Sequence, residues 1–560
     1  MLNTSNDQHK LLPNFEQLFA TTAQAPGGVA RLRELILTLA VQGKLVPQDP
    51  SDEPASELLK KIRAEKDRLI AEGKIKKDKP LPAITEEEKP FELPVGWEWV
   101  INGNLFSLRK GKNPKDLSEK PIGKPYLDIE ALDRGQVRRF SCDLKAPTCN
   151  SNDILVVCDG SRSGLILQGK DGIIGSTLAA IDAPKELQPF IKLLFKSGYR
   201  RYNSGMKGAA IPHLDTKFLL NELNGLPPLS EQSRIVARVE ELMRLCDALE
   251  EKGRLEQTQH QQLLQAMLDS LTQTTDARDL ARHWQRLVQH FDLLIDRPEA
   301  VDALEQTILQ LAVRGLLVPQ DPSDEPASEL LKKIRVEKDR LIAEGKIKQD
   351  KALSPITDEE KEFDLRAGWE RVRLRDLVSH LGDGLHGTPN YSTIGEYYFV
   401  NGNNLRDGVI VIKSETKRVD KSEFEKYKKP LDETTVLVSI NGTLGNVAFY
   451  NGEKVVLGKS ACYFNLTSGI KKSFVRIILE SPDFKKYAYK SATGSTIKNL
   501  GLKAIGDWPI ALPPLAEQSR IVARVTELRA LCQQLREKLT QARTTQTQLA
   551  QAWVEQVATI

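Results

Sequence analysis

The 560-residue sequence predicts an α+β protein with two mixed α/β domains, joined by repeated long antiparallel helices of coiled-coil type in a pseudo-twofold arrangement. Three observations carry this prediction: a charged segment occurs twice, an apolar helical seam occurs twice, and each pair of repeats encloses a β-rich insert. A chain of this length is too long for one core, since domains usually contain about 100 to 200 residues. We therefore expect several domains.

The first repeat is a charged segment that follows an apolar helix. Residues 36–79 and 308–351 match at 39 of 44 positions, and both contain the run VPQDPSDEPASELLKKIR. Four apolar residues at helical spacing precede Gly43: Leu32, Leu35, Ile36 and Leu39. Gly43 and Pro47 are expected to end this helix, and residues 54–73 predict a second helix that is rich in charge.

The second repeat predicts a long helix with an apolar seam. GLPPLSEQSRIVARVEELMRLCDALEEK at 225–252 returns at 511–538 as ALPPLAEQSRIVARVTELRALCQQLREK. The first copy predicts a helix from Glu231 to about Thr272, with an interruption near Gly253. The seam residues recur every three or four positions: Ile235, Val239, Leu242, Cys246 and Leu249 in one copy, and Ile521, Val525, Leu528, Cys532, Leu535 and Leu539 in the other. Such a seam requires a helical partner.

The inserts between the repeats have a different pattern. DILVVCDG from Asp153 and TTVLVSING from Thr434 are short β-rich runs broken by Gly and Asn, which is typical of mixed α/β domains. We divide the chain into an N-terminal helical region (1–96), a first domain (97–225), a central helical region (226–368), a second domain (369–511) and a C-terminal helix (512–560).

Charge separates the inserts from the repeats. The chain carries +4, but the two inserts carry +5 and +6, which leaves −7 on the rest. This distribution is expected if the inserts contact phosphates and the helices contact protein. An ordinary fluctuation of surface charge is the alternative explanation.

Several function classes lack their motifs. The N-terminus MLNTSNDQHK has no signal-peptide pattern and no run of about 18 apolar residues follows, so we expect a cytoplasmic protein without a membrane partner. The six cysteines form no CxxC pair and the seven histidines no HExxH, so neither a disulfide framework nor a metal site is predicted. GEKVVLGKS from Gly452 has five residues between its glycines, where a phosphate-binding loop has four, and predicts a turn and strand.

The repeats and the inserts together resemble a known family. LPPLSEQSRIVARV and LPPLAEQSRIVARV each follow a divergent domain, and GDGLHGTPNY from Gly382, RKGKNPKD from Arg109 and GSTIKNL from Gly494 add to the pattern, whereas GAAIPHL from Gly208 departs from it. The chain resembles the specificity (S) subunit of type I restriction-modification systems from about Arg31 to its end.

The resemblance implies a DNA reader without catalysis of its own. Each insert would be a target recognition domain that reads one half of a split, asymmetric site in double-stranded DNA. The helices would dock two adenine-N6 modification subunits, and restriction subunits would join the complex. The resemblance implies no cofactor for this chain, and S-adenosylmethionine, ATP and Mg²⁺ for the partner subunits. Agreeing with this, the sequence has no [DN]PP[YF] motif and no Gly-rich cofactor loop.

Two other function classes stay open. A stand-alone DNA-modifying enzyme would require the missing motifs, and methylation by the purified chain alone would identify it. A helical scaffold that binds only proteins would shift no DNA, with or without partners.

Three sets of polar residues are the candidates for DNA contact. The first set opens each insert: Lys110, Lys112, Asn113 and Lys115 in one, and Asp383, His386, Thr388, Asn390 and Tyr391 in the other. The second set lies on glycine-rich turns: Ser161, Arg162, Ser163, Asn441 and Thr443. The third set lies near the insert ends: Lys207, Lys498 and Asn499. Such side chains can contact base edges or phosphates, although each could instead be an ordinary turn residue.

The duplication also predicts how the ends of the chain pack. Two near-identical halves can offer equivalent docking surfaces to two identical partner subunits. For the halves to correspond, the C-terminal helix should pack on residues 32–39 as the central helix packs on residues 304–311. The expected contact residues are Leu539, Leu549 and Trp553 in the first case, and Leu263, Met267 and Leu271 in the second.

Overall fold

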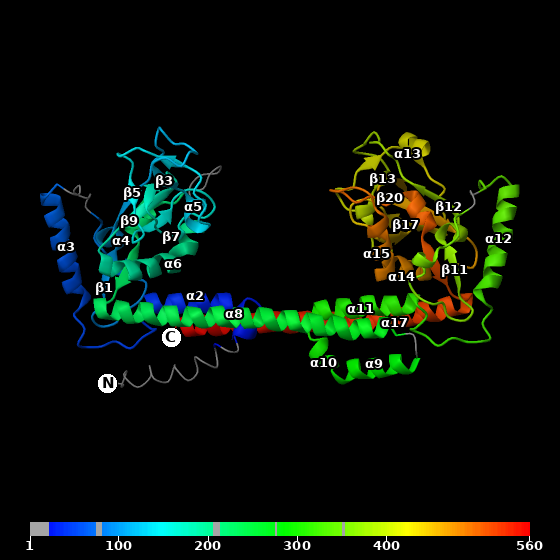
Figure 1. Cartoon of the computed structure of the whole chain (residues 1–560), viewed down its shortest axis with the longest axis horizontal. Coiled ribbons are helices and arrows are strands. Elements are labelled where there is room, and N and C mark those ends of the chain that lie inside the picture. Colours follow the sequence, from blue (N-terminus) through cyan, green and yellow to red (C-terminus); the bar gives the residue numbers. More distant parts are fainter. Residues whose placement is uncertain are drawn as a thin grey trace. The chain divides into compact units, whose positions relative to one another are not determined.

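The computed structural model describes residues 19, 22–73, 81–204, 213–274, 277–349 and 353–559. They form two compact units, one built from residues 1–256 and 543–560 and the other from residues 257–542. Each unit contains one α/β domain packed against helices (Figure 1). Two mixed α/β domains and long helices agree with the predicted fold class.

Three helices form the base of the first unit. Helix α2 (Gly28–Val41) runs antiparallel to the first part of α8 (Leu229–Thr272) and parallel to the end of α17 (Leu515–Thr559). Helix α2 ends as predicted, because Gly43 adopts a φ of 72°, which favours glycine. The core shared by α2 and α8 contains Leu32, Ile36, Ala40, Ile235 and Val239.

The first insert forms two four-stranded sheets and one two-stranded sheet. Its strands are β1 (Glu98–Ile101), β2 (Ser107–Lys110), β3 (Lys124–Leu127), β4 (Phe140–Ser141), β5 (Thr148–Cys149), β6 (Ile154–Val157), β7 (Ile166–Gln168), β8 (Gly172–Ile174), β9 (Leu178–Asp182) and β10 (Leu223–Leu226). Its helices are α4 (Asn102–Leu105), α5 (Ile129–Asp133), α6 (Gln188–Ser204) and α7 (Thr216–Asn221). The strand orders are β2-β9-β6-β7 and β4-β3-β8-β5, and β1 pairs antiparallel with β10. The insert therefore begins and ends on adjacent strands.

The second insert has a corresponding plan. Its strands are β11 (Glu370–Arg373), β12 (Val378–Asp383), β13 (Tyr397–Val400), β14 (Leu405–Arg406), β15 (Val409–Ile410), β16 (Arg418–Val419), β17 (Thr435–Ser439), β18 (Val447–Phe449), β19 (Val455–Leu457), β20 (Ala461–Leu466) and β21 (Pro509–Leu512). Its helices are α13 (Lys421–Tyr427), α14 (Lys472–Glu480), α15 (Pro482–Ser491) and α16 (Leu502–Asp507). The main sheet has the order β12-β20-β17-β18, and β11 pairs antiparallel with β21.

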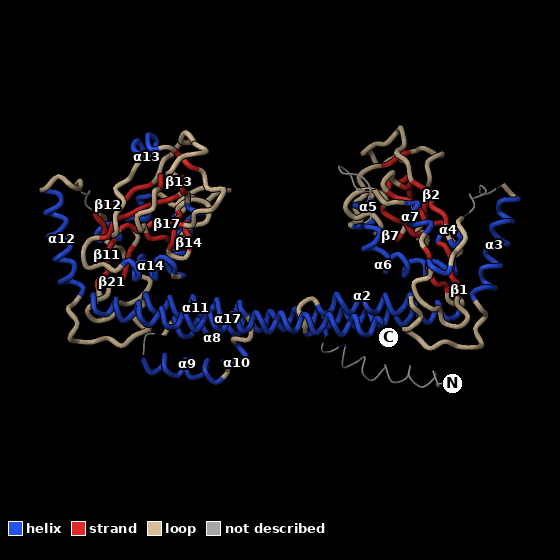
Figure 2. The backbone as a smooth tube through the Cα atoms, turned by 180° about the vertical axis from the view of Figure 1, so that it is seen from behind, coloured by secondary structure: helices blue, strands red, loops and turns tan. Residues whose placement is uncertain are grey.

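The helices of the second unit repeat the arrangement of the first. Helix α11 (Pro298–Val313) runs antiparallel to the first part of α17, which lies alongside it in Figure 2. It runs parallel to the end of α8, where Arg314 donates to the Thr272 carbonyl at 2.9 Å. Helices α9 (Ala277–Gln289) and α10 (Phe291–Leu294) precede it.

The charged segment of each unit folds into the predicted helix. Helix α3 (Ala55–Ala71) belongs to the first unit and α12 (Ala327–Ala343) to the second. In each unit the backbone N–H at the start of the helix donates to a glycine carbonyl before the insert, from Ala55 to Gly96 at 2.9 Å and from Ala327 to Gly368 at 2.8 Å. Each helix therefore begins at the first strand of its own insert.

A buried glutamate joins each insert to its long helix. In the first unit, Glu231 accepts hydrogen bonds from Trp97 Nε1 at 3.0 Å and Gln48 Nε2 at 3.1 Å. The second unit repeats these bonds at 2.9 Å and 2.7 Å with Glu517, Trp369 and Gln320, respectively. Both carboxyl groups are 1% exposed, and burial raises their pKa values. These contacts explain why the EQSRIV motif and the GW dipeptide recur together.

The predicted seam lies in the helix cores. Ile235, Val239, Leu242 and Cys246 are buried in the first unit, and Ile521, Val525 and Cys532 in the second. The other seam residues pack against these cores: Leu249, Leu528, Leu535 and Leu539. The expected interruption near Gly253 is wrong, because α8 continues through it. A Cβ added at Gly253 would point into open space, so no neighbouring segment presses on the helix at this position.

The contact between the C-terminal helix and α2 exists, but its register differs from the prediction. Arg31 Nε donates to Gln551 Oε1 at 2.9 Å, and Ala550 is buried. Two of the predicted contacts, Leu549 and Trp553, are 54% and 41% exposed, and the third, Leu539, packs against the core of the second unit.

In the second unit, two of the three predicted contacts are present and one is displaced by a residue. Leu264, Leu268 and Leu271 are buried, Met267 packs against the core, and Leu263 is 53% exposed. When two adjacent residues are apolar, as Leu263 and Leu264 are, the sequence does not show which of them faces the core.

Among the described residues, no helix combines the length and apolar character needed to cross a membrane.

Candidate nucleic-acid interface

In the first insert, two of the candidate loops leave the main sheet at one end. Strand β9 lies between β2 and β6, and Lys110 pairs with Ala179 while Val157 pairs with Leu178. The loop after Lys110 and the turn after Val157 therefore start from neighbouring positions. Their side chains also meet, because Lys110 Nζ lies 3.8 Å from Asp159 Oδ2.

Close backbone contact fixes the start of the opening loop in each insert. A Cβ at Gly111 would lie 2.1 Å from the Gly175 carbonyl oxygen, and a Cβ at Gly384 would lie 2.2 Å from that of Leu457. Only glycine permits these approaches. Beyond them the predicted side chains Lys112, Asn113 and Lys115 are exposed, as are His386 and Thr388. The glycines thus hold exposed polar loops at the sheet end.

The glycine-rich turn of the first insert contains residues with different roles. Arg162 is partly exposed and bonds Asp133 at 2.8 Å, which lowers the pKa of that carboxyl. Ser161 is exposed. Ser163 is fully buried and donates to the Gly160 carbonyl at 2.8 Å, so its hydroxyl supports the turn and cannot reach DNA here. Lys207 lies outside the described residues.

The second insert brings the second and third candidate sets together. Asn441 forms a β-bridge with Asn499, and Gly442 N donates to the Lys498 carbonyl at 2.9 Å. The first insert has the equivalent bridge between Asp159 and His213, whose side chains lie 2.7 Å apart. In both inserts, the turn after the central strand therefore pairs with the segment near the insert end. Thr443 is exposed on this turn.

The opening loop of the second insert starts beside this turn. Asp383 pairs with Cys462 and Ser439 with Ala461, so both segments leave β20 at adjacent residues. Within the loop, His386 Nε2 lies 2.6 Å from Asp383 Oδ2 and its ring is largely exposed.

Two further candidates in this loop differ in availability. Asn390 Nδ2 donates to the Glu423 carboxylate at 3.2 Å, and its backbone N–H donates to the same group at 3.1 Å. This double contact makes Asn390 a structural anchor of the loop. Tyr391 is 42% exposed, and the Lys417 ammonium lies 4.4 Å from its ring centroid.

A repeated basic pair escaped the sequence reasoning. Arg138 and Arg139 lie at strand β4 of the first insert, and Lys417 and Arg418 lie at β16 of the second. Two of these cations lie over tyrosines of the neighbouring strand: Arg139 is 4.7 Å from the Tyr126 ring centroid and Arg418 is 5.0 Å from that of Tyr398. In the sequence these residues are two adjacent basic residues, and no glycine marks a turn beside them as it does at the predicted loops.

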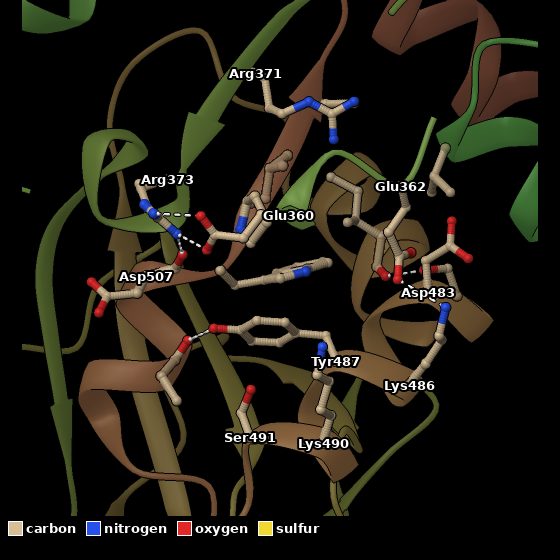
Figure 3. A pocket seen from close by; sticks show the side chains of 18 of the residues that line it. Glu360, Glu362, Arg371, Arg373, Asp483, Lys486, Tyr487, Lys490, Ser491 and Asp507 are labelled. Atoms are coloured by element: carbon tan, nitrogen blue, oxygen red, sulfur yellow. Dashed lines mark hydrogen bonds and ion pairs between the residues drawn. The ribbon is translucent and has the colours of Figure 1, made fainter. Parts of the chain in front are cut away.

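A groove of 880 Å³ in the second unit has Asn499 in its lining. Figure 3 shows two ion pairs in this groove: Arg373 lies 2.7 Å from Glu360, and Lys486 lies 3.0 Å from Glu362. Acidic side chains share the lining with the basic ones, so the groove gives no argument for a phosphate ligand. No group of three or more metal-ligating side chains comes together within the described ranges.

Comparison with known proteins identifies the family. The model of the type I restriction modification DNA specificity domain matches residues 94–260 and 367–542. The chain belongs to this family. It is 37% identical to the EcoAI specificity subunit of the Escherichia coli type I restriction enzyme, over 94% of this chain and 93% of that one. It is 35% identical to the EcoEI specificity subunit of the same species, over the same shares.

The chain also matches solved structures. The HsdS subunit from Thermoanaerobacter tengcongensis matches 84% of this chain and 98% of its own length, with 20% identity and a TM-score of 0.35. The two family-model matches each cover one insert and part of the long helix after it, so the chain contains the domain twice.

Proposed function

We propose that this chain reads a bipartite, asymmetric DNA site, with one half contacted by each insert domain. The observation that carries the proposal is the sheet-end cluster present in both units. The same scaffold positions exposed polar and basic loops in each unit, but the loop sequences differ, as RKGKNPKD and GDGLHGTPNY show. Different side chains on one scaffold are expected to select different half-sites.

The charge of the inserts supports DNA as the ligand. Phosphate contacts from Lys and Arg supply most of the affinity, whereas base-edge contacts supply sequence selection. The net charges of +5 and +6 lie on the domains that carry the candidate loops. The candidates available at these loops include Lys112, Lys115, Arg162, Tyr391 and Lys498.

The chain is proposed to act without catalysis, as one subunit of a larger cytoplasmic complex. Its relatives are specificity subunits of type I restriction enzymes, which implies partner subunits that methylate and cleave DNA. In this proposal two copies of the adenine-N6 modification subunit and the restriction subunits dock on the chain. S-adenosylmethionine, ATP and Mg²⁺ then bind those partners.

Sequencing of methylated adenines tests the proposal. The chain is expressed with its modification subunit in cells that lack both, and each subunit alone serves as the control. The expected result is methylation only in the pair, at two short specified sequences separated by unspecified bases. A single continuous motif would contradict two separate readers. Methylation by the purified chain alone would instead support a stand-alone enzyme, and absence of any DNA binding by the complex would support a scaffold.

A further inference from the structure

Helices α2 and α11 keep most of their buried residues and change many of their outer ones. Helices α2 and α11 are identical at 7 of 14 positions, and four of the retained residues are buried in α2: Leu32, Ile36, Leu39 and Ala40. Several partly exposed positions differ, as with Arg31 and Ala303 or Glu34 and Gln306. This is the expected pattern, since exposed substitutions usually change stability by less than about 0.5 kcal/mol.

Helices α3 and α12 break this pattern. They are identical at 16 of 17 positions, although little of either helix is buried. The buried residues are Ala55 and Ile62 in α3, and Ala327, Leu330 and Ile334 in α12. Five charged residues of each helix are exposed and identical: Lys60, Lys61, Arg63, Asp67 and Arg68 in α3, and Lys332, Lys333, Arg335, Asp339 and Arg340 in α12. Core packing does not require these identities.

A recent duplication does not explain the retention, because other segments of the same repeats have diverged. Residues 257–272 and 543–558, which end the two long helices, are identical at only 5 of 16 positions. The inserts differ throughout. Something outside the fold of each unit therefore preserves the exposed face of α3 and α12.

The composition of this face favours a protein ligand. At its centre stands the one position that differs, Ala64 in α3 and Val336 in α12, and Val336 is 70% exposed. Charged residues surround it, which is the arrangement of an apolar centre and a polar rim found in protein interfaces. DNA is disfavoured because acidic residues, including Asp67, share the face with the basic ones.

Ion pairs hold part of the rim in place. Lys61 lies 2.7 Å from Glu53, and Lys333 lies 2.7 Å from Glu325. Each α3 and α12 helix carries five basic and three acidic side chains, so a complementary surface should be acidic overall.

We propose that the outer faces of α3 and α12 are two copies of one docking site, each for one copy of the same protein subunit. The subunit would present a net acidic surface around a small apolar pocket. This inference rests on the proposed function, in which the modification subunit is the protein that binds twice. The equality of the two faces accounts for binding of two identical copies to a single chain with two different insert domains.

Charge reversal of the face tests the proposal. The single variants Arg63→Glu and Arg335→Glu and the double variant are mixed with the modification subunit, and native mass spectrometry counts the bound copies. Neither arginine has an ion pair among the described residues, so the helices should stay folded, which circular dichroism checks. We expect one bound copy for each single variant, and at least ten-fold weaker binding at both sites for the double variant.

Two controls make the result specific. Arg286→Glu reverses an exposed basic residue of α9, which lies outside α3 and α12, and it should leave two copies bound. The conservative variant Arg63→Lys should also bind normally. If the double variant binds two copies with unchanged affinity, the docking proposal is overturned while the DNA-reading function stands. If it loses DNA binding by the chain alone and keeps both copies, the face contacts DNA and the docking proposal is again overturned.

Discussion

Replacing Arg33 with Glu should weaken the packing of α2 on α8, because Arg33 holds an ion pair whose signs are reversed in the other unit. In the first unit, Arg33 Nη2 lies 2.7 Å from Asp247 and 2.9 Å from Glu250. In the second unit, the equivalent of Arg33 is Glu305, which lies 2.9 Å from Arg536. The acidic and basic partners have exchanged helices.

The magnitude follows from the exposure of the groups. The Arg33 side chain is 29% exposed and its two acidic partners are 67% and 68% exposed, so solvent screens both pairs. Each such pair contributes about 0.2 to 1 kcal/mol, and a like-charge contact costs a similar amount. Arg33→Glu should therefore lower the free energy of unfolding by about 1 to 2 kcal/mol. The buried face of α2 is unchanged by the substitution.

A transplant of the second unit's residues should restore the loss. The triple variant Arg33→Glu, Asp247→Gln and Glu250→Arg reproduces Glu305, Gln533 and Arg536, where Arg536 also donates to Gln533 at 2.6 Å. Calorimetric unfolding of the single and triple variants at low and high salt measures the effect. A triple variant as unstable as Arg33→Glu would refute the exchange of signs as the cause.

Three further predictions concern the two buried glutamates, Glu231 and Glu517, and the loops of the inserts. Because burial raises the pKa values of Glu231 and Glu517, the folded chain binds protons more tightly than the unfolded chain, so stability should fall as pH rises from about 4.3 through the raised values. In urea unfolding across this range, Glu231→Gln and Glu517→Gln should flatten that dependence. Gly384→Ala should impair reading of the second half-site only, since its methyl group would press on the Leu457 carbonyl; equal loss at both halves in methylome sequencing would argue against it. Arg162→Ala should relax the first half-site by about 1 to 3 kcal/mol if it contacts a base, measured by competition between DNA duplexes, whereas a uniform small loss would indicate a phosphate contact.

The fold could be predicted wherever local signals and the repeat agree. The helix stop at Gly43 and the charged helix at 54–73 depend on residues that act within one turn, and both are present. The interruption near Gly253 was wrong because exposed glycine lowers helix propensity by only about 1 kcal/mol, which the packing of a 44-residue helix overcomes. The one-residue error at Leu549 arose because neighbouring apolar residues fit two helical stripes equally well.

The position of the candidate site could be predicted from the sequence, but the role of each residue in it could not. Glycines after the strands showed where loops leave the sheet. The sequence could not show that Ser163 turns inward, or that Asn390 is held by Glu423, 33 residues away. The basic pair at Arg138 and Arg139 was missed because its position over Tyr126 depends on pairing between separate strands.

The pairing of first and last strands in each insert has a consequence for how such proteins change. Glu98 lies opposite Leu226, and Glu370 lies opposite Leu512, so the two ends of each insert lie side by side on paired strands. An insert of another length or sequence needs only to begin and end with the same two paired strands to fit between the same helices. Because the flanking residues are nearly the same in both halves, a foreign module could be spliced into either one. Under the proposed function, exchange of a whole insert would change the DNA target and leave the docking helices unchanged.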